Sequence, residues 1–120
     1  MAKVHIPGFK LLAPIITSDG GGPTAAVSFA ENGTDVVTTV VATQAHGGGP
    51  VNYSITAGAD AALFEIVGAT GELFFIDAPD FETPLDANAD NAYLVTVTAT
   101  GRGELTDTQA ITVTVTNVVE

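Results

Sequence analysis

Cysteine and tryptophan are absent from this chain of 120 residues, and only three basic residues stand against fourteen acidic ones. Without cysteine there is no disulfide. His5 and His46 are far apart in sequence and lack the neighbouring ligands that a zinc site needs. The net charge of −11 excludes nucleic acid as a partner, because phosphate binding requires clustered lysine and arginine.

Long apolar runs are also missing. No stretch of about 18 apolar residues occurs, so we expect no membrane insertion. The first twelve residues do not resemble a signal peptide, because Pro7, Gly8 and Lys10 interrupt any apolar core. With so few cations, an anionic membrane surface is not an expected partner either.

What the chain does contain is abundant valine, isoleucine and threonine, which favour a pleated, half-buried surface. Alternation is clearest from residue 92 to 100, where Tyr93, Val95, Val97 and Ala99 share one face. Strands are expected at residues 25–30, 36–43, 51–56, 63–67, 72–76, 92–100 and 108–118. Their spacing, with 13 glycines for turns, predicts an all-β fold: a seven-stranded antiparallel Greek-key β-sandwich with an extra N-terminal strand or tail.

The first 22 residues differ from the remainder. Residues 1–17 hold Lys3 and Lys10, two of the three cations, together with seven large apolar residues, and a glycine-rich linker follows. We therefore divide the chain into an N-terminal extended segment with its linker, residues 1–22, and a sandwich domain, residues 23–120. Such an apolar tail is expected to dock either on its own sandwich or on the sheet edge of a neighbouring chain.

An acidic connection, residues 80–91, joins two of the expected strands and holds four of the fourteen acidic residues. Asp86, Asn88 and Asp90 alternate like the first three ligands of an EF-hand, although the glycine and final glutamate of that loop are missing. Hard oxygen ligands in this pattern favour Ca²⁺, which we predict as the cofactor. The alternative is that these residues only form turns on a solvated loop.

Several short motifs, in a consistent order over nearly a hundred residues, carry a family resemblance. They are Ala30-Glu31-Asn32, Tyr53-Ser54-Ile55, Phe64-x-Ile66, Thr70-Gly71-x-Leu73, Asp80-Phe81-Glu82, Tyr93-x-Val95-x-Val97-x-Ala99 and a Thr-Val-Thr-Val run in the last strand. From about residue 23 to residue 120, the chain resembles a bacterial cadherin-like repeat, a calcium-binding Ig-like β-sandwich module.

The resemblance implies calcium ligands at the end of the domain from which the chain exits. The implied ligands are Glu31, Asp80, Glu82, Asp86, Asn88 and Asp90. At the opposite end, Gln44-Ala45-His46 and Gly101 replace the aspartates that family members usually carry there. The exit linker, residues 116–120, is also less acidic than usual, and these departures argue against calcium bridging between consecutive domains.

Catalysis is not expected, because no serine has a histidine and a carboxylate near it in sequence. Asp80 and Glu82 could serve as paired acids in glycoside hydrolysis, but the chain has little aromatic surface to bind a sugar. The predicted function is a calcium-binding extracellular structural or adhesion module of a bacterial surface protein, with neighbouring cadherin-like domains or copies of itself as partners.

Two alternatives to this function stay open. One is a self-assembling filament, a matrix fibre joined by N-terminal strand addition through residues 1–17. The other is an engineered cadherin-like scaffold, with altered loops at residues 44–50 and 101–104.

Overall fold

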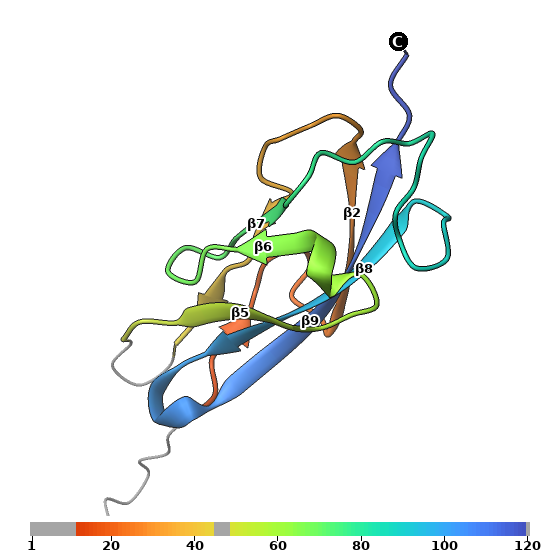
Figure 1. The fold of residues 1–120 in the computed structure, drawn as a ribbon. Coiled ribbons are helices and arrows are strands. Elements are labelled where there is room, and N and C mark those ends of the chain that lie inside the picture. The colour runs from red at the N-terminus through yellow and green to blue at the C-terminus, as the bar shows by residue number, and fades with distance from the viewer. Residues whose placement is uncertain (1–11, 45–48, 120) are drawn as a thin grey trace, which may run out of the picture.

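Two β-sheets lie face to face and enclose the core, as the computed structural model shows (Figure 1). It describes residues 12–44 and 49–119. One sheet contains, in spatial order, β2 (Thr24–Ala30), β9 (Thr106–Thr116), β8 (Ala92–Thr100) and β5 (Asn52–Ala57). The other contains β3 (Thr38–Thr39), β7 (Glu72–Phe75) and β6 (Phe64–Ile66), while β1 (Ile15–Ile16) pairs with β4 (Ala42–Thr43). The prediction of an all-β sandwich is confirmed.

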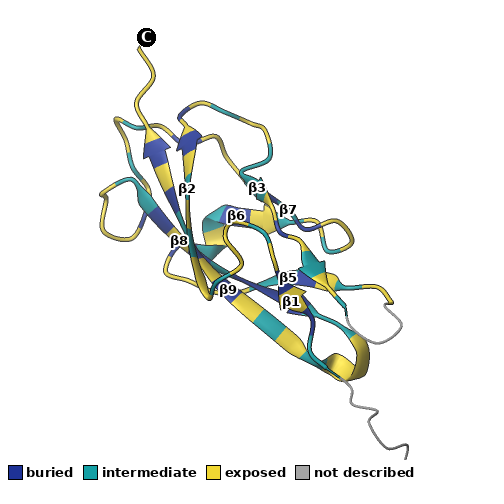
Figure 2. Ribbon diagram, turned by 180° about the vertical axis from the view of Figure 1, so that it is seen from behind, coloured by how far each residue is buried: buried dark blue, intermediate teal, exposed yellow. Residues whose placement is uncertain are grey.

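The core forms where the predicted alternation points. On β8, Tyr93, Val95, Val97 and Ala99 are buried, and Ile111, Val113 and Val115 line the same side of β9. Along β9, buried residues alternate with exposed or partly exposed ones (Figure 2). Full burial of a large apolar side chain contributes about 1.5–3 kcal/mol, so this seam stabilises the sandwich strongly.

The predicted strand at residues 36–43 is two short strands, β3 and β4, because the run pairs with different neighbours at its two ends. β3 pairs with β7, and the N–H of Val40 donates to the carbonyl of Gly71. β4 pairs with β1, and the carbonyl of Val41 accepts from Thr17. Counting β1, which lies in the expected extra N-terminal segment, the described residues form nine strands, because this split adds one to the predicted seven.

One strand pair departs from the antiparallel prediction. β2 runs parallel to β9 over seven residue pairs, from Thr24–Ala110 to Ala30–Thr116. The reason is that both strands begin at the same end of the molecule: the Ser18–Pro23 linker carries the chain there, and the carbonyl of Pro23 accepts from the N–H of Ala110.

Part of the tail packs on its own sandwich. Ile16 is buried in the core, and its N–H donates to Asp107 Oδ2 at 2.8 Å. Residues 1–11 of the predicted N-terminal segment lie outside the described residues, as does His46. No helix among residues 12–44 and 49–119 is long and apolar enough to cross a membrane.

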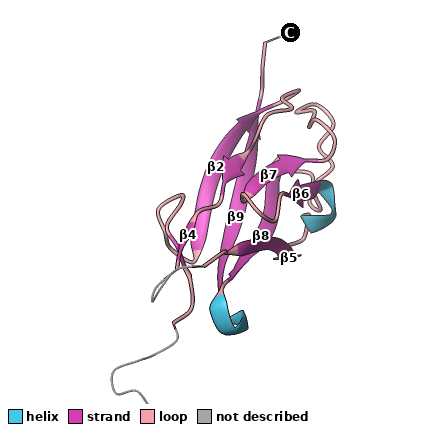
Figure 3. Cartoon of the chain, turned by 90° about the vertical axis from the view of Figure 1, so that its left-hand side faces the viewer, coloured by secondary structure: helices cyan, strands magenta, loops and turns pink. Residues whose placement is uncertain are grey.

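The molecule has two distinct ends. The short 3-10 turn η2 (Arg102–Glu104) lies at the end opposite the C terminus, whereas the second 3-10 turn, η1 (Ala61–Leu63), lies at the side (Figure 3). We call the end at η2 the N-terminal pole and the end where β2 and β9 finish the C-terminal pole.

Candidate metal centre

Glu31 follows directly after β2 at the C-terminal pole and is buried, with 3% of its surface exposed. Its Oε2 accepts the N–H of Phe81 at 2.8 Å, and its Oε1 accepts the N–H of Val118 at 2.9 Å. One carboxylate therefore ties together the end of β2, the acidic connection and the segment after β9. The predicted meeting of Glu31 with the acidic connection is present in the structure.

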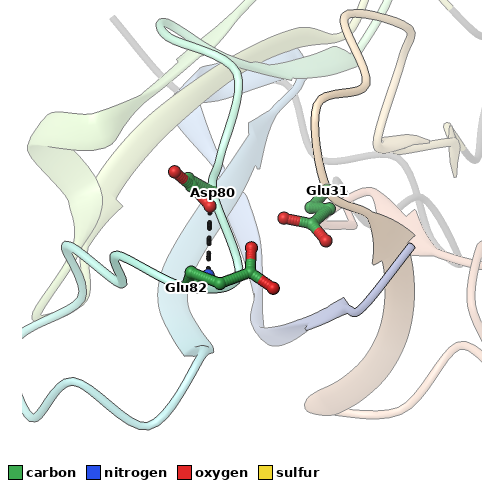
Figure 4. Close-up of side chains that lie close together, drawn as sticks. All are labelled: Glu31, Asp80 and Glu82. Carbon is green, nitrogen blue, oxygen red and sulfur yellow. Dashed lines mark hydrogen bonds between the residues drawn. The ribbon is translucent and has the colours of Figure 1, made fainter. Parts of the chain in front are cut away.

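Asp80 and Glu82 reach the same place from the acidic connection. Asp80 Oδ1 accepts the N–H of Glu82 at 3.0 Å, and the N–H of Asn32 donates to the carbonyl of Pro79 at 2.8 Å. Oxygens of Glu31, Asp80 and Glu82 lie within 4.8 Å of one another (Figure 4). We call these three residues the acidic triad.

Electrostatics in the acidic triad disfavour three negative charges. Loss of solvent around Glu82, followed by the nearby Asp80 and Glu31 carboxylates, raises the pKa of Glu82 above its ordinary value. Like charges so close together favour the protonated form of a carboxylate. A bound cation would remove this repulsion without a proton.

The donor set of the acidic triad fits a hard cation. All of its ligand atoms are carboxylate oxygens, which suit Ca²⁺ or Mg²⁺ rather than zinc or copper. Ca²⁺ takes about six to eight oxygens at roughly 2.3–2.6 Å and accepts bidentate carboxylates. Glu31 already accepts two N–H groups, but each of its oxygens keeps a lone pair that can bind an ion.

Asp86, Asn88 and Asp90, also predicted as ligands, lie outside the acidic triad. Asp86 is buried, and its two oxygens accept the N–H groups of Asp90 at 2.9 Å and Asn91 at 3.0 Å. Asn88 and Asp90 are exposed, and Asp90 Oδ1 accepts the N–H of Ala92. These bonds match the turn-forming alternative, and a ligand role for these three residues stays a prediction.

Burial of the Asp86 carboxylate acts to raise its pKa, but its hydrogen bonds outweigh that effect. The donors are the backbone N–H groups of Asp90 and Asn91, and the net result is a lowered pKa. The Asp86 carboxylate therefore stays ionised, and its hydrogen bonds to Asp90 and Asn91 hold the loop in a closed turn.

Asp60 is a structural residue of this region that the sequence analysis missed. It is buried just before η1, and its oxygens accept the N–H of Ala87 at 2.7 Å and of Leu94 at 2.8 Å. It thereby fixes the acidic connection to the start of β8. The local sequence gives no signal for this role, because the two donors lie 27 and 34 residues away.

The N-terminal pole shows how the sequence departures from the cadherin pattern fit together. Gln44 Oε1 accepts the N–H of Arg102, and Gln44 Nε2 donates to the carbonyl of Leu12. A side chain at Gly101 would collide with Gln44 and Pro14. Glycine at residue 101 therefore lets the Gln44 side chain pack against the backbone there, and a larger residue would require Gln44 to move.

Structure comparison places this chain beside cadherin extracellular domains. Drosophila N-cadherin EC1-3 matches with a TM-score of 0.71 and 21% identity over 90% of this chain. Domains 1–4 of protocadherin gamma B7 match at 0.68 and 22% over 88%, and its EC3-6 cis-dimer structure at 0.68 and 21% over 88%. This chain covers 35%, 24% and 23% of those longer chains, respectively.

Sequence comparison adds one short match. Halomucin of Haloquadratum walsbyi is 51% identical to this chain over 37 residues. The matched segment is 31% of this chain, and its share of the much longer Halomucin is 0% to the nearest per cent. No protein-family profile matches. These structural matches show that the chain has the β-sandwich fold of cadherin extracellular domains.

Proposed function

We propose that this chain is a calcium-binding, non-catalytic structural or adhesion module of an extracellular protein at a bacterial cell surface. The observation that carries the proposal is the acidic triad: segments fifty residues apart bring three carboxylates together at the C-terminal pole. Three carboxylates this close together repel one another, and a bound divalent cation would compensate their negative charge. Neighbouring cadherin-like domains or copies of this chain are the proposed partners.

The role of calcium is mechanical. Glu31 already joins β2, the acidic connection and the segment after β9 through hydrogen bonds. An ion shared with Asp80 and Glu82 would lock these segments and stiffen the end that faces a following domain. Because the ion binds the folded state, it adds about 2.7 kcal/mol of stability at a concentration of 100 times its Kd.

The test is a calcium titration followed by calorimetry and thermal unfolding, with chelator as the reference. We expect wild type to gain melting temperature with calcium and Asp80→Asn to lose most of that gain. Glu65→Gln is the matched control, because it removes one exposed carboxylate outside the acidic triad. A wild type whose melting temperature is the same in calcium and in chelator would refute the proposal.

A second pair of variants separates the two predicted ligand sets. Asp90→Asn changes the EF-hand-like set, whereas Asp80→Asn changes the acidic triad. If Asp90→Asn abolishes the calcium response and Asp80→Asn preserves it, the ion has been assigned to the wrong carboxylates.

A further inference from the structure

A pocket of about 240 Å³ opens beside the acidic connection. Leu63, Phe75 and Tyr93 give it apolar walls, and the exposed side chains of Ile76 and Leu85 also line it. Exposed large apolar side chains around a hollow are typical of a surface that binds a partner.

The charge beside this apolar lining is negative. Asp77 and Asp80 both line the pocket and are exposed. An occupant with matching chemistry would combine large apolar side chains with lysine or arginine, because opposite charges around an apolar centre give specificity.

The chain itself contains one segment of that chemistry. Residues 1–11 carry Lys3, Lys10 and no acidic residue, whereas residues 12–120 carry all fourteen acids and Arg102 alone as a cation. Their charges are +2 and −13, which sum to the total of −11. The same eleven residues include Val4, Ile6 and Phe9 as apolar side chains.

This segment joins the described chain at Leu12, at the opposite pole from the acidic connection that borders the pocket. Leu12 lies at the N-terminal pole, where its carbonyl accepts from Gln44 Nε2, and Ile15 and Ile16 pair with Thr43 and Ala42. Phe9 is three residues from Leu12, a reach of about 10 Å. β9 alone, with 11 residues, spans about 36 Å between the poles.

We propose that residues 1–11 of one copy bind in this pocket of a second copy. Val4, Ile6 or Phe9 enters the apolar hollow, and Lys3 and Lys10 lie against Asp77 and Asp80. Because the two surfaces differ and lie at different places on the molecule, the contact is head-to-tail and can extend into an open chain of copies. The proposal does not depend on calcium, although Asp80 belongs to both sites.

The experiment is sedimentation velocity of the full chain over a concentration series, in chelator, so that calcium bridging cannot contribute. Wild type is expected to associate reversibly, and less so at high salt. Reversal of the tail charges in Lys3→Glu/Lys10→Glu, or of the pocket charge in Asp77→Lys, is expected to raise the half-association concentration at least about tenfold, because like charges then meet.

Mixing supplies the sharper test. The Lys3→Glu/Lys10→Glu variant keeps an acidic pocket, and Asp77→Lys keeps a basic tail, so a mixture of the two should associate again. Glu65→Lys, a charge reversal at an exposed residue that does not line the pocket, should associate like wild type. Any of three results would overturn the proposal. They are a wild type that stays monomeric, association that is unchanged when the tail charges are reversed, and a mixture of the two variants that fails to associate.

Discussion

Two acidic side chains close together in sequence act in opposite ways in this domain. Asp86 is surrounded by N–H donors, whereas Glu82 faces other carboxylates. From the sequence alone, the two residues could not be distinguished, because both belong to the acidic connection. Their environments differ because the fold brings Glu31 to Glu82 and leaves Asp86 with its own loop.

Glu82→Gln should stabilise the protein in chelator and abolish most of its response to calcium. The raised pKa of Glu82 means that the folded state holds a proton more tightly than the unfolded state, so stability falls as pH rises from the ordinary glutamate value through the raised one. The variant lacks this loss. Urea unfolding at several pH values, with and without calcium, measures both effects.

If Glu82→Gln is less stable than wild type at neutral pH in chelator, the carboxylates of the acidic triad do not repel each other as described. Asp80→Asn should change stability in the same direction, because it removes a charge from the same cluster.

Asp86→Asn should cost about 1–3 kcal/mol at neutral pH, because an amide in place of the buried carboxylate leaves one N–H without an acceptor. The lowered pKa of Asp86 makes its contribution fully present above the ordinary aspartate value and lost as pH falls through the lowered one. Denaturant unfolding at neutral and acidic pH measures this. The exposed Asp77 supplies the control, Asp77→Asn, and equal losses in both variants would contradict the assignment.

At the scale of the elements, a glycine fixes how the hairpin of β6 and β7 packs. Gly71 has a φ of +82°, and a Cβ there would collide with the carbonyl of Val40, which lies between β3 and β4. Gly71→Ala is therefore expected to destabilise the domain by more than 1 kcal/mol, through both strain and contact. Thermal unfolding tests this, with Ala69→Gly, a change in the same loop, as the reference.

The elements also show how far the sequence could lead. Strands β8 and β9 were predictable, because their alternation is long and regular. The split of β3 from β4 and the parallel pairing of β2 with β9 were not predictable. Both depend on which strand pairs with each edge, and the local sequence does not specify this. For the acidic triad, the family resemblance supplied Glu31, since fifty residues separate it from Phe81, to which it is bonded.

The whole molecule is polarised. Carboxylates gather at the C-terminal pole, whereas the N-terminal pole is closed by Gln44 and Gly101, which fit one another. The same polarity underlies the two proposals, because calcium and the tail of a second copy would both bind at or near the C-terminal pole.

The parallel pair of β2 and β9 has a consequence for how the domain bears force. A pull along the long axis, applied upstream of Thr24 and downstream of Thr116, would slide these strands past each other. Their seven-residue ladder would then be loaded in shear, with all of its bonds sharing the tension at once. β1 has only two paired residues, so it would detach from β4 first. The released segment would then extend before the force reaches the β2–β9 pair.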